Sequence, residues 1–255
     1  MIPRLYIDAP LASGGAAPLS ADQAHYLRTV LRREIGAPLR LFNGREGEFA
    51  GEIADLGKKG GIAAIAGRTR AQDAEPDLTL FFAPVKRAAV EMIAQKATEI
   101  GVRRLVPVIT QRVTAPKPNL ARLRAIALEA AEQCGRLTVP SVDEPVKLAD
   151  LLEAPGVDRL LFCDEAGDDE AEDWGGREGR AAPVLEALKT FDRDAEAWGV
   201  ATGPEGGFTP AERASLRARD FVTPATLGPR ILRADTAALA ALVLWQAAAG
   251  DWRRR

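Results

Sequence analysis

The sequence has few of the residues on which metal sites and thiol chemistry depend. It contains one histidine, His25, and two cysteines, Cys134 and Cys163, among 255 residues. A zinc site takes three or four such ligands close together, so this composition excludes a typical zinc enzyme. Two distant cysteines form no disulfide framework, which favours a reducing cytoplasm. We expect both cysteines to be small buried hydrophobic residues and the lone histidine to be structural.

The common nucleotide-binding motifs and long hydrophobic runs are also missing. No G-x-G-x-x-G follows a strand and no G-x-x-x-x-G-K-[ST] occurs, so neither a Rossmann site nor a P-loop is indicated. The longest apolar run, residues 237–249, is interrupted by Gln246 and is too short to cross a membrane about 30 Å thick. Residues 1–8 are already charged and do not resemble a signal peptide. We therefore expect no membrane association.

The net charge of −2 conceals an uneven distribution along the chain. Residues 84–136 carry ten Lys or Arg against four acids, whereas residues 137–196 carry six against seventeen. A basic segment of this kind can face the phosphates of a nucleic acid, although a solvated helix surface is an equally good explanation. The acidic run over residues 164–178 predicts a solvated loop, because like charges repel one another and resist packing.

The first 70 residues have the pattern of a small β domain. Ser20 and Gln23 form a capping box that begins a helix extending to Val30. Asn43-Gly44 between two apolar runs predicts a hairpin. A compact β unit with little helix is typical of oligonucleotide-binding or PUA-like barrels. We predict this domain over residues 1–70, a linker over 71–77, and strands over 5–7, 39–42, 48–53 and 62–66.

From Leu78 onward, apolar strands alternate with amphipathic helices. This alternation predicts an α/β domain over residues 78–255 with a parallel sheet covered by helices on both faces. Gly101 and Gly135 follow two of the helices, where glycine commonly ends a helix. The predicted strands are 78–82, 102–109, 159–163, 197–202 and 221–227, and the predicted helices are 87–100, 120–134, 183–190, 209–218 and 236–249.

Two glycine turns follow the last two predicted strands. The first reads Gly203-Pro204-Glu205-Gly206-Gly207-Phe208, and the second opens the segment Leu227-Gly228-Pro229-Arg230-Ile231-Leu232-Arg233. Open α/β sheets bind ligands at the carboxyl ends of their strands, and glycine lets the backbone approach a ligand closely. Taken alone, the first turn could be a plain turn or an anion cradle, and the two arginines could simply form surface ion pairs.

The final predicted helix, residues 236–249, is apolar on nearly every side. Such a helix must be covered all round, either within a core or at an interface between protein chains. It therefore indicates a dimer formed through this region.

The two glycine turns together resemble the SPOUT superfamily of trefoil-knotted methyltransferases, and most closely its 16S ribosomal RNA (uracil-N3)-methyltransferase family. The sequences of residues 95–102 and 129–136 also resemble those of that family. Residues 25–28 and 30–32 resemble its PUA-like domain. The resemblance covers nearly the whole chain in the same order. Asp235 stands where many members have glutamate, which keeps the carboxylate and shortens it by one methylene.

The resemblance implies a C-terminal α/β domain with a trefoil knot that binds S-adenosylmethionine, an N-terminal PUA-like domain, and a homodimer. Three loops would hold the adenine through backbone groups. The cofactor-binding residues it implies are Leu161, Phe162, Cys163, Thr202, Gly203, Pro204, Glu205, Gly206, Gly207, Leu227, Gly228, Arg230, Ile231 and Leu232.

The implied reaction is methylation of N3 of one uridine in the decoding region of 16S rRNA, without a metal. The catalytic residues that the resemblance implies are Arg233, Glu205 and Arg136. We expect Arg233 to stabilise the negative charge of the deprotonated base, with Arg136 and Arg112 positioning base or RNA. Glu205 or Asp235 could remove the proton, although Asp235 could instead cap a helix. The implied RNA-binding residues are Arg28, Arg32, Arg112, Arg136 and Arg233.

Three other functions stay open. The same fold could methylate the 2′-oxygen of a ribose. An RNA-binding assembly factor of the ribosome could have lost catalysis, although the intact glycine turns and Arg233 argue against this. An α/β phosphate-binding protein could use residues 203–207 as an anion cradle.

Overall fold

A computed structural model describes residues 2–169, 171–189 and 197–253. It divides the chain into two compact units, each with its own core. The first unit comprises residues 1–74 and 128–139, and the second comprises residues 75–127 and 140–255. Residues 128–139, which we predicted to lie in the second domain, therefore pack with the first.

The first unit is built on a five-stranded sheet in the order β1-β3-β4-β5-β2. The predicted capping box is confirmed, because Ser20 Oγ accepts a hydrogen bond from the Gln23 N–H and Gln23 Oε1 accepts one from the Ser20 N–H. The helix continues to Val30 as a π-helix, and β2 was not predicted. The strands are β1 (Arg4–Tyr6), β2 (Ala16–Leu19), β3 (Pro38–Phe42), β4 (Glu48–Leu56) and β5 (Gly61–Arg70), and the helices are α1 (Ala21–His25) and η1 (Tyr26–Val30).

Arg4 of β1 fixes residues 128–139 within this unit. Its guanidinium donates hydrogen bonds to the carbonyl oxygens of Ala131, Glu132 and Arg136 at 2.8 to 2.9 Å. The same group donates to Glu48 Oε2 at 2.7 Å. An arginine fork can satisfy several carbonyls at the end of a helix, which explains why this segment leaves the domain that its position in the chain predicts.

The second unit alternates strands and helices as predicted, with a parallel sheet in the order β12-β10-β11-β6-β7-β8 and β9 paired to β7. The short elements α4, β8 and β9 were not predicted. The strands are β6 (Asp77–Phe82), β7 (Arg104–Ile109), β8 (Ser141–Val142), β9 (Val146–Lys147), β10 (Arg159–Cys163), β11 (Ala197–Thr202) and β12 (Val222–Ala225). The helices are α2 (Arg87–Ile100), α4 (Leu148–Glu153), η2 (Asp173–Gly175), α5 (Val184–Ala187), α6 (Pro210–Arg217), α7 (Ala234–Ala248) and η3 (Asp251–Arg253). Helix α3 (Leu120–Cys134) begins in this unit, and its residues 128–134 belong to the first.

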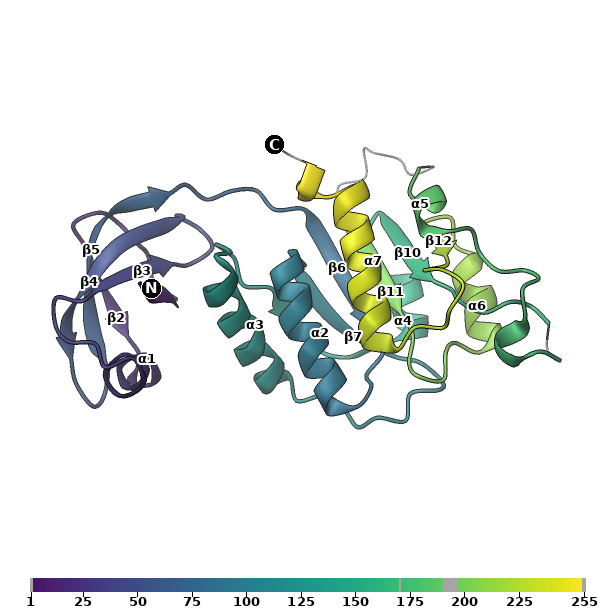
Figure 1. Cartoon of the computed structure of the whole chain (residues 1–255), viewed down its shortest axis with the longest axis horizontal. Helices are drawn as coiled ribbons and strands as arrows, with labels where there is room; N and C mark the ends of the chain where they lie inside the picture. The colour runs from purple at the N-terminus through teal and green to yellow at the C-terminus, as the bar shows by residue number, and fades with distance from the viewer. Residues whose placement is uncertain (1, 170, 190–196, 254–255) are drawn as a thin grey trace. The chain divides into compact units, whose positions relative to one another are not determined.

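Helices cover both faces of this sheet. Leu78, Leu80 and Phe82 of β6 pack against α2 and α7, which lie side by side in Figure 1. Phe81, between them in sequence, belongs to the opposite core, with residues of α4 and α6. Successive side chains of a strand point to opposite faces, so a strand buried on both faces is a continuous apolar run.

The sheet brings three strand ends to one edge. Strands β12, β10 and β11 are parallel neighbours, and their register pairs Cys163 with Ala225 and Phe162 with Ala201. The segments that follow Cys163, Thr202 and Ala225 therefore leave the sheet together. These are the three loops that the family resemblance implies for cofactor binding.

One sequence-based expectation needs correction. Cys163 is buried, as expected, but Cys134 at the end of α3 is exposed. Within one chain, helix α7 is buried along one side only, since Val243 is 38% exposed and Leu239 and Leu244 are partly buried; the expectation that an interface covers the rest stays a prediction. Among the helices described, none is long and apolar enough to cross a membrane.

Candidate functional site

A cavity of about 610 Å³ opens where the three strand ends meet. Clefts of this volume are typical of sites for small-molecule ligands. The loop after β10, the glycine turn after β11, the first turns of α6 and the segment leading into α7 form its walls. The lining residues are Arg112, 163–169, Glu172, Trp174, Gly175, 202–205, Gly207, Phe208, Pro210, Arg213, Ala214, Arg217, Ile231, Leu232, Ala234 and Ala237.

The structure brings many of the predicted site residues to this cavity. From the set expected to bind the cofactor, these are Cys163, Thr202, Gly203, Pro204, Glu205, Gly207, Ile231 and Leu232. Arg112, expected to bind RNA, also lines it. Residues from three loops that are far apart in the chain therefore share one cavity.

Other predicted residues do not line the cavity. Leu161 and Phe162 are fully buried in the cores on the two faces of the sheet. Arg233 is exposed and occupies the N-cap position of α7, next to Leu232 and Ala234, which do line the cavity. Gly206, Leu227, Gly228 and Arg230 belong to the same two turns but are outside the lining.

The remaining predicted arginines belong to the first unit. Arg28 and Arg32 are exposed, on η1 and just after it. Arg136, expected to take part in catalysis, is 8% exposed, and its Nε donates to Thr138 Oγ1 at 3.0 Å. The structure thus places Arg136 outside the unit that contains the cavity.

The first glycine turn needs glycine at two positions. A Cβ on Gly203 would lie 2.7 Å from Cε2 of Phe208, whose ring packs edge-on against Phe162 with centroids 5.0 Å apart. Gly207 has a φ of +67°, and a Cβ there would lie 2.9 Å from Cζ3 of Trp174. Side chains at these positions would force neighbours to move, so the close-packed turn depends on glycine.

Helix α6 begins directly after this turn with a second capping box. Glu212 Oε2 accepts a hydrogen bond from the Thr209 N–H at 2.9 Å, and Thr209 Oγ1 accepts one from the Glu212 N–H. Glu212 Oε1 also accepts a hydrogen bond at 2.7 Å from the N–H of Gln111, just after β7. One buried carboxylate therefore joins the segment that carries Arg112 to the glycine turn.

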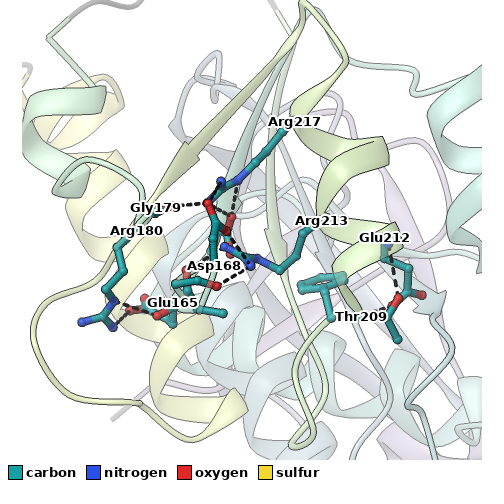
Figure 2. Close-up of polar contacts among 12 residues, drawn as sticks. Glu165, Asp168, Gly179, Arg180, Thr209, Glu212, Arg213 and Arg217 are labelled. Carbon is teal, nitrogen blue, oxygen red and sulfur yellow. Dashed lines mark hydrogen bonds and ion pairs between the residues drawn. The ribbon is translucent and has the colours of Figure 1, made fainter. Parts of the chain in front are cut away.

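Arginines of α6 hold the acidic segment 164–180 against the domain (Figure 2). The Nε atoms of Arg213 and Arg217 each donate to one oxygen of Asp164 at 2.7 Å. Arg213 also donates to the carbonyls of Ala166 and Gly167, both at 2.7 Å, and pairs with Asp168 at 3.1 Å. The expectation of a solvated loop holds for most of this segment, since Asp168, Asp169, Glu172 and Glu178 are exposed. It was wrong for Asp164, which is buried, because its ion pairs with these two arginines offset the cost of burying the charge.

Glu165 connects this segment to the second glycine turn. Its Oε1 accepts a hydrogen bond from the Leu227 N–H at 2.7 Å, and its Oε2 lies 3.7 Å from the guanidinium of Arg180. Burial raises the pKa of Glu165, against the lowering effects of the Leu227 N–H and Arg180. Two of the three loops around the cavity are therefore fixed to each other through one side chain.

Asp164→Ala is expected to lower the free energy of unfolding of the second unit by about 3 kcal/mol, because it leaves the buried Arg213 guanidinium without its main partner. Urea unfolding followed by tryptophan fluorescence measures this, since all four tryptophans belong to that unit. The control is Glu172→Ala, an exposed carboxylate of the same segment, which should change the free energy by less than about 0.5 kcal/mol. Equal effects of the two variants would contradict this account.

Three residues of the site were not predicted from the sequence: Arg213, Arg217 and Trp174. The two arginines are four residues apart on one predicted helix, and a strongly acidic segment precedes them in the chain. That combination could have suggested ion pairs between them. Asp235 was considered as a helix cap, but the N-cap is Arg233, and Asp235 lies in the first turn, where its Oδ1 accepts from the Thr236 N–H.

The fold and the cavity together define an α/β domain that binds a small ligand at the carboxyl ends of parallel strands, joined to a small β unit. Among the residues that the structure describes, no group of three or more His, Cys, Asp or Glu is arranged to hold a metal ion. A family model described as an RNA methyltransferase domain matches residues 73–246, and one described as an RNA methyltransferase PUA domain matches residues 19–65. The chain belongs to this RNA methyltransferase family.

Relatives of known name agree with this assignment. The ribosomal RNA small subunit methyltransferase E of Rickettsia conorii is 31% identical over 240 residues, which cover 94% of this chain and 93% of the relative. The protein of the same name from Synechocystis is 34% identical over 231 residues, 88% and 70% of the two chains. A crystal structure of the Neisseria gonorrhoeae enzyme of that name, bound to S-adenosyl methionine, has a TM-score of 0.84 at 27% identity and covers 99% of this chain and 100% of its own.

Proposed function

We propose that this protein methylates N3 of a uridine in the decoding region of 16S rRNA, with S-adenosylmethionine as methyl donor. The observation that carries the proposal is the cavity at three strand ends in a chain of the RNA methyltransferase family. Relatives named for methylation of small-subunit rRNA, and a similar structure bound to S-adenosyl methionine, support the substrate and the donor.

The cavity fits the donor in size and in character. Its volume of about 610 Å³ is suitable for a bent nucleoside with an amino-acid tail. Gly203 and Gly207 let the backbone of one wall pack closely against Phe208 and Trp174, and the peptide groups of this turn would hold the adenine. When bound, S-adenosylmethionine supplies a methyl group on a positively charged sulfur, and acidic residues among the lining suit that charge.

The residues of this chain would prepare the base for attack. Uracil N3 carries a proton and is a poor nucleophile until that proton leaves. Arg233 is exposed beside the cavity, where its charge would stabilise the anion that develops on the uracil oxygens. Glu205, exposed in the glycine turn, or Asp235 would accept the proton.

The RNA would be held by arginines on both units. Three exposed arginines would contact phosphates: Arg28 and Arg32 in the first unit and Arg112 in the second. Arg136, in the first unit, would position the RNA. Because N3 is on the pairing edge of uracil, the target must be unpaired or flipped out of its helix. We also infer that the protein acts in the cytoplasm, without a metal, and that its C-terminal segment forms a trefoil knot.

We infer further that the protein is a homodimer formed through α7. The partly exposed side of this helix carries Leu239, Val243 and Ala247, which follow one another at helical spacing. Val243→Glu should therefore convert a dimer to a monomer in size-exclusion chromatography with light scattering. Leu185→Glu, at an exposed apolar residue of α5, should leave the dimer intact. A wild-type monomer would disprove the inference.

Reverse transcription of small-subunit rRNA tests the function. Methylation of N3 blocks base pairing, so rRNA from cells with the protein should stop the polymerase at one uridine, and rRNA from cells without it should not. If the 2′-oxygen is the target instead, the strong stop will be absent and a 2′-O-methyl nucleoside will be found. If the protein is an inactive assembly factor, neither modification will differ between the strains.

A further inference from the structure

We propose that Trp174 stacks on the flipped target base and, with Arg112, forms the pyrimidine-binding part of the site. This inference rests on the proposed function and extends it to a residue of the acidic segment. Trp174 lines the cavity, yet 42% of it is exposed. An aromatic ring that is partly exposed at a ligand cavity can bury its remaining apolar surface against a ligand.

The backbone of Trp174 has an unusual conformation. Its φ of 57° and ψ of 25° lie in the left-handed region, which is uncommon for any residue with a side chain and is unfavourable for a large one. Such conformations persist where the surrounding structure enforces them, and they are frequent at ligand sites. Here the Trp174 carbonyl accepts a hydrogen bond from the Gly167 N–H at 2.8 Å, which holds the residue next to the start of the segment.

The segment that presents Trp174 is fixed at both ends to α6. Arg213 binds Asp164, Ala166 and Gly167 before the tryptophan, and Arg217 donates to the carbonyl of Gly179 after it at 3.0 Å. Figure 2 shows the two arginines directed toward Asp168 between these points. The chain is thus held to α6 on both sides of the indole, as a preorganised binding surface requires.

Trp174 and Arg112 contact successive residues of the first glycine turn. The indole abuts Gly207, where a Cβ would lie 2.9 Å from its Cζ3. The Arg112 guanidinium donates to the Gly206 carbonyl at 2.9 Å, and its aliphatic chain would lie 3.5 Å from a Cβ on that glycine. An aromatic ring and a guanidinium therefore flank one turn that also forms a wall of the cavity.

This pair of groups matches the chemistry of an unpaired pyrimidine in RNA. Single-stranded bases are bound by stacking on aromatic rings and by hydrogen bonds to their edges. The arginine side chain can only donate hydrogen bonds, and the two carbonyl oxygens that flank N3 of uracil can accept them. Stacking on Trp174 would compensate for the stacking lost when the base leaves its helix.

Steady-state kinetics of full-length variants test the proposal, with small-subunit rRNA from cells lacking the protein as substrate. Trp174→Ala should lower kcat/KM for RNA roughly 10- to 100-fold, the usual range for loss of a base-stacking ring, with most of the change in KM. Its affinity for S-adenosylmethionine should stay within about threefold of wild type, which also shows that the cavity is folded. Trp174→Phe keeps an aromatic face and should recover most of the loss.

The matched control is Trp252→Ala, because Trp252 is 53% exposed and does not line the cavity. It should leave kcat/KM unchanged. Wild-type kcat/KM in Trp174→Ala, or a loss of donor affinity equal to the loss in kcat/KM, would overturn the assignment. The second of these outcomes would mean that the indole contacts the donor.

A binding measurement separates failure of this inference from failure of the proposed reaction. In a Trp252→Phe background, Trp174 is the remaining exposed tryptophan among the described residues. An RNA hairpin with an unpaired uridine in its loop should quench its fluorescence, and the same hairpin with an abasic residue there should not. Quenching without methylation would contradict the reaction and keep the stacking site, whereas equal quenching by both hairpins would refute the stacking site.

Discussion

Arg233→Ala is expected to abolish methylation of the RNA, with a loss in kcat of roughly 100-fold or more, while the protein stays folded and binds S-adenosylmethionine normally. Removing one preorganised donor from a developing oxyanion has effects of about that size. Arg233 is exposed at the N-cap of α7, outside the cavity lining but next to it. Its guanidinium can therefore face a substrate at the mouth without contributing to the donor pocket. Transfer of a labelled methyl group to rRNA measures the effect.

Two further variants sharpen this result. Arg233→Lys keeps the charge but not the planar fork, so it should retain part of the activity. Arg219→Ala removes a surface arginine that pairs with the exposed Glu153 at 2.6 Å, and it should change neither activity nor donor affinity. Full activity of Arg233→Ala would remove this residue from the site.

Gly203→Ala is expected to weaken binding of S-adenosylmethionine about tenfold or more. The added methyl would lie 2.7 Å from Cε2 of Phe208, a ring already packed against Phe162. Because the ring cannot move without disturbing the core on that face of the sheet, the strain should displace the turn that forms a wall of the cavity. Isothermal titration with the donor measures the loss.

Gly206→Ala is the control in the same turn. Its Cβ would be in ordinary contact, 3.5 Å from the nearest atom, and its φ lies outside the left-handed region. Donor affinity should therefore stay within about threefold of wild type. Equal losses for the two substitutions would show that the turn is sensitive for a reason other than the packing of Phe208.

Much of the fold could be predicted because its signals are local. The helix predicted over residues 120–134 is α3 with the same bounds, and Gly135 follows it with a φ of +82°. The Asn119 side chain caps its start by accepting a hydrogen bond from the Arg122 N–H. The apolar strands β10 and β11 were predicted with their observed bounds. Each of these predictions depends on residues adjacent in sequence, where capping and periodicity act directly.

The errors concern contacts between residues far apart in the chain. The Arg4 side chain holds residues 128–139 within the first unit across more than 120 positions. Asp164 meets Arg213 and Arg217 about 50 residues later. Sequence patterns can suggest that such charges pair, but they do not say which residues meet, so the burial of Asp164 and the position of Trp174 at the cavity were not predicted.

Analysis of the modified nucleoside tests the central claim most directly. Purified protein, S-adenosylmethionine and small-subunit rRNA from cells lacking the protein would be incubated, and the digested RNA examined by mass spectrometry. The account predicts one new N3-methyluridine per rRNA, with none when Arg233→Ala replaces the wild-type protein. A methyl group found on a ribose 2′-oxygen, or no methyl transfer by a wild-type protein that binds the donor, would contradict it.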